Sequence, residues 1–259
     1  MTRLLEFVRA SIKAIPEVIP HLTGRARWHA RVYTWQDDGQ AVKTYDFYLN
    51  ALERLVKDVY RADIGGDFID IMANLVQGQM TRAYQEAWKD SGGEGEVPQH
   101  LQDILETTIL AEYDHVDQFY RDIVDARVDG GPIDPLLARA ALWANRYNDA
   151  YNMALLEIRA NDEAATGKPQ NMIWERGATE KSCDICITLD GVIASATVWK
   201  DAGIFPQSGQ DGVLPNPALV SHRDGQDGCG GWKCDCGLKD TDESATIESA
   251  QALRDLIGW

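Results

Sequence analysis

Five cysteines and one histidine in the last third of the chain are the residues best suited to chemistry. Cys183 and Cys186 form a Cys-x-x-Cys pair, and Cys234 and Cys236 form a Cys-x-Cys pair further along. Thiolates and imidazoles at such spacings are the ligands that Zn²⁺ takes in tetrahedral sites. The sequence therefore predicts a zinc site drawn from Cys183, Cys186, His222, Cys229, Cys234 and Cys236.

A tetrahedral shell needs four ligands, so six candidates compete for four positions. Three of them rank first: Cys183, Cys186 and Cys234. The fourth position is open between His222 and Cys236, and Cys229 ranks last. A filled shell leaves no open position for water, so the zinc is expected to hold the fold together rather than to catalyse. A thioredoxin-like redox role for the Cys-x-x-Cys pair is the alternative, but it needs a βαβ context that the flanking sequence lacks.

The sequence contains none of the common patterns that would mark an enzyme. It has no HExxH helix, no deaminase-type zinc signature, no GxSxG and no phosphate-binding P-loop. The four histidines outside the predicted zinc site each stand without a partner motif. We therefore expect no catalytic and no cofactor-binding residues, and we predict that the protein is not an enzyme.

The charge of the chain limits its partners. Lys and Arg number 25 and Asp and Glu number 41, which gives a net charge of -16. An acidic protein of this kind repels nucleic-acid phosphates. The first 35 residues nevertheless carry net +4, so an N-terminal arm could bind an acidic surface. No apolar run approaches the length of about 20 residues that a membrane span requires, and we predict no membrane span.

Apolar residues recur at helical spacing through the middle of the chain. This pattern predicts two helices over residues 45–88, separated at Gly65-Gly66, and a long helix from Pro98 to about Val128. A turn over residues 129–135 leads into another helix with an apolar stripe that reaches Ile158. These helices predict a helical bundle, and an aromatic stripe of this kind is more typical of a core than of a cofactor site.

The character of the sequence changes near residues 161–172, where Gly, Pro, Asp and Cys increase. Short β-prone runs such as GVIASATVW follow, and a last helix is expected over about 244–257. The predicted fold class is α+β and mainly α: a helical bundle followed by a small β-containing, zinc-stapled C-terminal module and a terminal helix. The predicted domains are a basic N-terminal arm (1–44), a helical domain (45–165) and a Cys/His zinc-binding module with a C-terminal helix (166–259).

The order of these features resembles a known protein family. The matching pieces are RAALWANRYNDAYNMALLEI, Trp174, SCDICITLDG, His222 and Cys234-Asp235-Cys236-Gly237-Leu238. Together they resemble the C-terminal domain of phage head morphogenesis proteins, the Mu F-like minor head (minor capsid) protein family. The resemblance covers about residues 98–240. The sequence departs from the family pattern in two places, at Ala144-Asn145-Arg146 and in the glycine-rich stretch HRDGQDGCGGWKCDC.

The resemblance implies a non-enzymatic virion protein that acts in capsid assembly. It implies association with the portal protein or the major capsid protein, proximity to packaged DNA, and a location in the capsid interior and in the host cytoplasm during assembly. The alternative is an intracellular zinc-ribbon-like adaptor that binds protein or nucleic acid. Residues 161–259 carry net -8, which argues against nucleic acid and leaves protein binding open.

Overall fold

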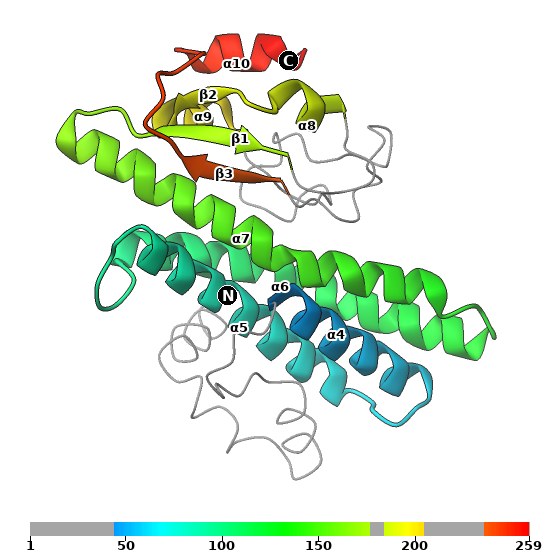
Figure 1. Ribbon diagram of the computed structural model, residues 1–259. Helices are drawn as coiled ribbons and strands as arrows, with labels where there is room; N and C mark the ends of the chain where they lie inside the picture. The colour runs from blue at the N-terminus through cyan, green and yellow to red at the C-terminus, as the bar shows by residue number, and fades with distance from the viewer. Residues whose placement is uncertain (1–43, 177–183, 205–235, 259) are drawn as a thin grey trace. The chain divides into compact units, whose positions relative to one another are not determined.

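The structure is a computed structural model that describes residues 44–176, 184–204 and 236–258 (Figure 1). These residues form two compact units. We call them the bundle unit (44–82 and Asp103–Tyr147) and the sheet unit (Ala83–Gln102 and the described part of Asn148–Trp259). The predicted fold class is confirmed in its coarse form, because the described chain is mainly helical and contains a small antiparallel sheet. The domain limits at 44/45 and 165/166 remain predictions.

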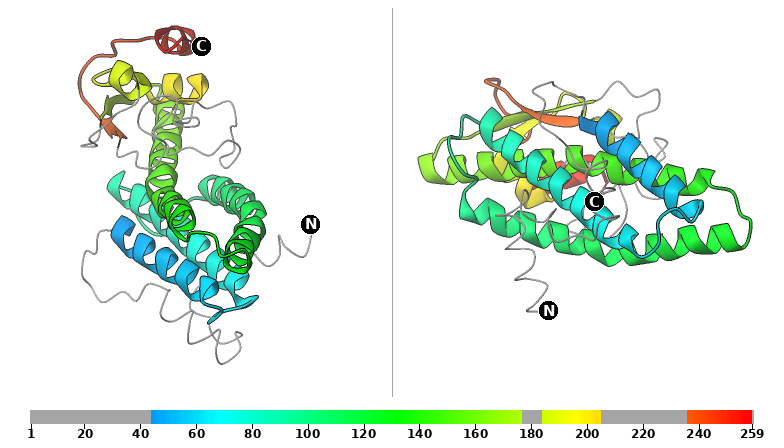
Figure 2. Two further views of the ribbon diagram at one scale, coloured as in Figure 1. Left: turned by 90° about the vertical axis from the view of Figure 1, so that its right-hand side faces the viewer. Right: turned by 90° about the horizontal axis from the view of Figure 1, so that it is seen from below.

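Four long helices contribute to the bundle unit and lie side by side within it (Figure 2). They are α4 (Thr44–Tyr60), α5 (Asp67–Asp90), α6 (Gln99–Val128) and α7 (Asp134–Thr166). The last three continue into the sheet unit. The predicted break between the first two is confirmed, since α4 ends at Tyr60, Ala62 has a left-handed backbone (φ 63°), and α5 begins directly after Gly65-Gly66.

Aromatic side chains on three helices fill the core of the bundle unit. The ring of Phe68 on α5 lies 6.0 Å from that of Phe119 on α6, which in turn lies 6.5 Å from the ring of Trp143 on α7. Phe68 and Phe119 are fully buried. Burying an aromatic side chain of this size stabilises a fold by about 2–3 kcal/mol. The apolar stripes predicted from the sequence therefore form the core.

The interior of the bundle unit also contains polar side chains. The buried amide of Gln79 on α5 donates to the carbonyl oxygens of Trp143 and Ala144 on α7, at 3.0 and 2.6 Å. Glu112 on α6 and Arg146 on α7 form a buried ion pair, with 3.2 Å between Oε1 and Nε. Buried polar contacts of this kind form in one arrangement of the helices, so they favour a single packing of the bundle.

A half-buried ion pair between α6 and α7 predicts a pH-dependent contribution to stability. Burial raises the pKa of Asp122. Hydrogen bonds from Arg139 and Gln118 and the positive charge of Arg139 together lower this pKa by more than burial raises it, so the net shift is downward. A lowered carboxyl pKa contributes stability above the unfolded-state pKa of about 3.9, and this contribution is lost as the pH falls through the folded-state value.

We therefore expect Asp122→Asn to be less stable than the wild type at neutral pH, with a difference that shrinks below about pH 4. Urea unfolding of the two proteins at several pH values measures this difference. The exposed Asp117, whose partner Arg121 lies one turn away on the same helix, is a matched control. A stability difference that stays constant down to the acid transition would contradict the prediction.

The sheet unit is built on three short strands in the order β2-β1-β3. The central strand β1 (Asn171–Glu175) pairs antiparallel with β2 (Ile193–Ser195) and with β3 (Gly237–Asp240). The unit also contains three short helices: α8 (Asp184–Leu189), α9 (Ala196–Ala202) and α10 (Ala250–Leu256). Trp174 of β1 lies 5.7 Å from Trp199 of α9 between ring centroids, and both are buried. This pair forms the centre of the second core.

Two of the predicted elements in this unit are wrong in extent. The β-prone run over 191–199 ends as a strand at Ser195, whose hydroxyl accepts a hydrogen bond from the Val198 N–H and begins helix α9. The last helix is shorter than predicted. Residues before Ser249 are not helical, since the N–H groups of Thr246 and Ile247 donate to the Ile193 carbonyl and cover the free edge of β2.

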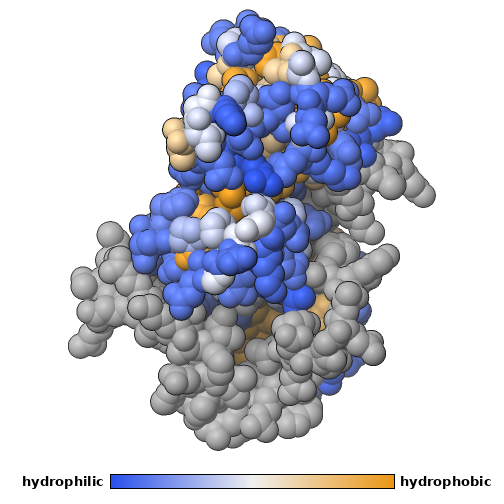
Figure 3. All heavy atoms as spheres, turned by 60° about the vertical axis from the view of Figure 1, so that its left-hand side comes forward, coloured by the Kyte–Doolittle hydropathy of each residue, from blue (hydrophilic) through white to orange (hydrophobic). Residues whose placement is uncertain are grey.

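Most large apolar side chains among the described residues are buried. Those that remain exposed are Val128, Ile187 and Leu256. The face shown in Figure 3 is correspondingly hydrophilic over most of the described residues. Within the described part of the chain, none of the helices combines the length and the apolar character needed to cross a membrane.

Candidate metal centre

Helix α8 positions Cys186, the second cysteine of the Cys-x-x-Cys pair. The cysteine lies in the first turn of this helix, and its side chain is 1% exposed. The helix is joined to the sheet directly after its end, because Gly191 N–H donates to the Trp174 carbonyl at 2.9 Å and Trp174 N–H donates to the Val192 carbonyl at 2.9 Å. The helix that carries Cys186 is therefore attached to β1 through the residues that follow it.

Strand β3 positions Cys236, the second cysteine of the Cys-x-Cys pair. Cys236 immediately precedes this strand and is 5% exposed. The strand pairs with β1, with Leu238 opposite Trp174 and Gly237 opposite Glu175. The segment after α8 and strand β3 are both hydrogen-bonded to β1. The short sheet therefore brings together two cysteines that are distant in sequence.

The Sγ atoms of Cys186 and Cys236 are 3.2 Å apart in the buried interior, too far apart for a disulfide bond between them. A disulfide would require about 2.05 Å. Two thiolates on one tetrahedral zinc, each about 2.3 Å from the metal, lie about 3.8 Å apart. The Sγ–Sγ distance thus lies between the length of a disulfide bond and the edge of a zinc–thiolate tetrahedron, and two buried soft donors fit the chemistry of such a site.

The other four candidates lie outside the described residues: Cys183, His222, Cys229 and Cys234. Within residues 44–176, 184–204 and 236–258, no group of three or more Cys, His, Asp and Glu side chains is arranged to hold a metal ion. The structure thus brings together one cysteine from each predicted pair, and the whole ligand set, including these two cysteines, remains a prediction.

Helix α7 supports the free edge of β3 through a buried amide. Asn152, which is 6% exposed, accepts a hydrogen bond from the Leu238 N–H at 3.3 Å and donates to the Asn148 carbonyl at 2.9 Å. Leu238 is two residues after Cys236. The amide therefore contacts the main chain next to the candidate ligand.

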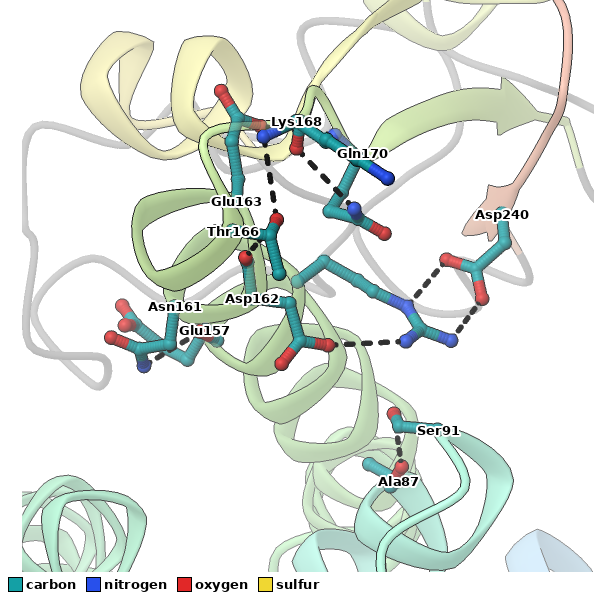
Figure 4. A network of polar contacts seen from close by, with 11 residues as sticks. Ala87, Ser91, Glu157, Asn161, Asp162, Glu163, Thr166, Lys168, Gln170 and Asp240 are labelled. Atoms are coloured by element: carbon teal, nitrogen blue, oxygen red, sulfur yellow. Dashed lines mark hydrogen bonds and ion pairs between the residues drawn. The ribbon is translucent and has the colours of Figure 1, made fainter.

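The same helix is attached to the other end of β3. Arg159 donates from two guanidinium nitrogens to the carboxylate of Asp240 and also contacts Asp162. Figure 4 labels both carboxylates and marks these contacts with dashed lines. The hydrogen bond with Asp240 raises the pKa of Arg159, which stays charged in any case. This bidentate pair anchors the end of β3 that is distant from Cys236.

Near its end, α7 supports the opposite side of the sheet. Glu163 accepts hydrogen bonds from the Gln170 N–H at 3.2 Å and from the Ser195 hydroxyl at 3.1 Å. These contacts tie the segment before β1 to the start of α9. The carboxylate thus acts as a shared acceptor for two segments that are distant in sequence.

Sequence reasoning did not identify these polar residues of α7 as functional. Asn152, Arg159 and Glu163 lie at intervals of seven and four residues, so they lie on one face of the helix. A polar row of this kind normally indicates a solvated face. Here the three side chains contact the strands of the sheet. The spacing of seven and four residues is the one feature of the sequence that could have indicated that they share a face.

No protein-family model, curated protein or solved structure matches this chain.

Proposed function

We propose that this chain is a non-enzymatic minor head protein of a tailed phage, of the Mu F-like family, and that a structural zinc ion staples its C-terminal part. The order of motifs along the sequence supports the family. The observation that carries the zinc proposal is the contact between Cys186 and Cys236, at 3.2 Å and across 50 residues of chain. A shared metal ion would explain why two buried sulfur atoms lie so close together without a disulfide bond between them.

The contact favours one ligand set over the others. Cys236 lies beside Cys186, so it takes the position that the sequence leaves open between Cys236 and His222. Cys183 and Cys234 lie three and two residues from these two cysteines, within reach of the same metal. The proposed shell is Cys183, Cys186, Cys234 and Cys236.

A structural zinc suits the architecture of the sheet unit. Its strands have only five, three and four residues, so few backbone hydrogen bonds join them. A zinc ion with four thiolate ligands would supply a rigid cross-link between α8 and β3 and no open coordination position. The described residues supply the buried frame around it.

The charge distribution supports a protein partner rather than a nucleic acid. The whole chain carries -16, while the first 35 residues carry +4. The basic N-terminal arm would bind an acidic surface of the portal protein or the major capsid protein, and the acidic remainder would not trap packaged DNA. The protein would then act in the host cytoplasm during assembly and lie in the capsid interior of the virion.

Quantitative mass spectrometry of purified phage particles tests this function. We expect the protein in immature or mature particles at between a few and some tens of copies, with the portal and major capsid proteins as internal standards. A lysate of the same cells after removal of particles serves as the control. Absence from both particle forms would contradict the proposal and favour the intracellular zinc adaptor.

A further inference from the structure

We infer that Asn152 of helix α7 is a positioning residue for the metal centre. The inference rests on the proposed zinc site and adds a residue that lies outside every cysteine motif. The hydrogen bonds that the structure describes for Asn152 join it to the main chain of Asn148 and Leu238 and not to a thiol. Its side chain instead holds the backbone of the segment Cys236-Gly237-Leu238, which carries one of the ligands.

The pattern of the sheet shows why this contact matters. Both backbone polar groups of Trp174 are used on the β2 side, toward Gly191 and Val192. The facing residue on β3, Leu238, therefore has no hydrogen bond to Trp174, and its N–H points away from the central strand. The Asn152 oxygen accepts this N–H in the buried interior.

The orientation of the Asn152 amide is set by its second hydrogen bond. Its Nδ2 donates to the Asn148 carbonyl one turn earlier on α7, at 2.9 Å, and this leaves the oxygen toward β3. Loss of the oxygen would leave a buried N–H without an acceptor, and the backbone would move to find one. A shift of β3 at this point would displace Cys236 from Cys186.

The two attachments of β3 to α7 provide a matched comparison. Asn152 holds the end next to Cys236, and Arg159 holds the other end through Asp240. The substitution Asn152→Leu removes the acceptor next to the ligand at similar volume. The substitution Asp240→Asn weakens the distant attachment of the same strand to the same helix. If Leu is not accommodated, Asn152→Ala removes the acceptor without adding bulk.

The experiment measures zinc retention of the full-length variants by competition with a chromophoric chelator, together with their unfolding midpoints in urea. We expect Asn152→Leu or Asn152→Ala to bind zinc about tenfold more weakly or worse, since substitution of groups that orient metal ligands commonly costs about 10–100-fold in affinity. Asp240→Asn should lower the unfolding midpoint and leave the zinc affinity unchanged within error.

Three results would overturn the inference. If both Asn152 variants bind zinc as the wild type does, Asn152 does not position the centre, while the zinc proposal stands. If Asp240→Asn loses zinc as strongly as they do, the effect reports general stability of β3. If the wild type itself binds no zinc, the proposed zinc site fails and the inference fails with it.

Discussion

Removal of zinc by a strong chelator is expected to unfold the sheet unit while the bundle unit stays folded. Zinc binding to a small structural site contributes about 10–16 kcal/mol of apparent free energy in zinc-finger peptides, and this free energy is folding free energy. The thiols all lie in the last third of the chain. Hydrogen exchange read by mass spectrometry should therefore show faster exchange in β1, β2, β3 and α8, and unchanged exchange in α4.

The expected loss of protection extends beyond the strands. Residues from Asn148 onward in α7 belong to the same compact unit as the sheet, and they contact it through Asn152, Arg159 and Glu163. We therefore expect the C-terminal half of α7 to exchange faster in chelator as well. The half of α7 that ends at Tyr147 should keep its protection.

Single cysteine substitutions test the ligand set independently. Cys186→Ser and Cys236→Ser should each lose bound zinc and show the same exchange pattern as the chelated wild type. Cys229→Ser is the matched control. The Cys229 thiol ranks last among the candidate ligands, so the protein that lacks it should still bind zinc. Wild-type protein that melts and exchanges identically with and without chelator would contradict a structural zinc. Loss of zinc on His222→Ala but not on Cys236→Ser would replace Cys236 by His222 in the shell.

The long helices could be predicted from the sequence because two signals agree there. Apolar residues recur at helical spacing over many turns, and Gly65-Gly66 and Pro98 separate the stretches. Short elements carry too few residues for a periodic pattern. Helix α8 was therefore not predicted, and α9 was predicted as part of a strand, since its start depends on a hydroxyl cap at Ser195.

The candidate metal centre was predictable in residue type but not in arrangement. Cysteine spacing identified six candidate ligands, including Cys186 and Cys236. The sequence left Cys236 and His222 as alternatives, because it does not show that the pairing of β3 with β1 brings Cys236 beside Cys186. Asn152 was not predicted at all, since a polar residue on a helix has the same local pattern whether it faces water or a neighbouring strand.

A second large effect is expected at the buried ion pair of the bundle unit. Arg146 and Glu112 are 4% and 1% exposed in their side chains, and the contact between them is an ion pair rather than an aligned hydrogen bond. Removing one side chain takes away the counter-charge that the other faces in this contact, and breaking a buried ion pair in this way typically costs about 3–5 kcal/mol. We therefore expect Arg146→Met and Glu112→Leu each to lower the free energy of unfolding by about this amount.

The double variant separates the value of the pair from the cost of breaking it. When both charges are replaced by apolar side chains of similar size, neither remains buried without compensation, so Arg146→Met with Glu112→Leu should recover most of the loss. Urea unfolding of the four proteins gives the coupling energy. The exposed pair Arg121–Asp117 on α6 is the matched control, and Arg121→Met should cost less than about 1 kcal/mol. If the two losses add in the double variant, the pair is not coupled, and each side chain contributes through its other contacts.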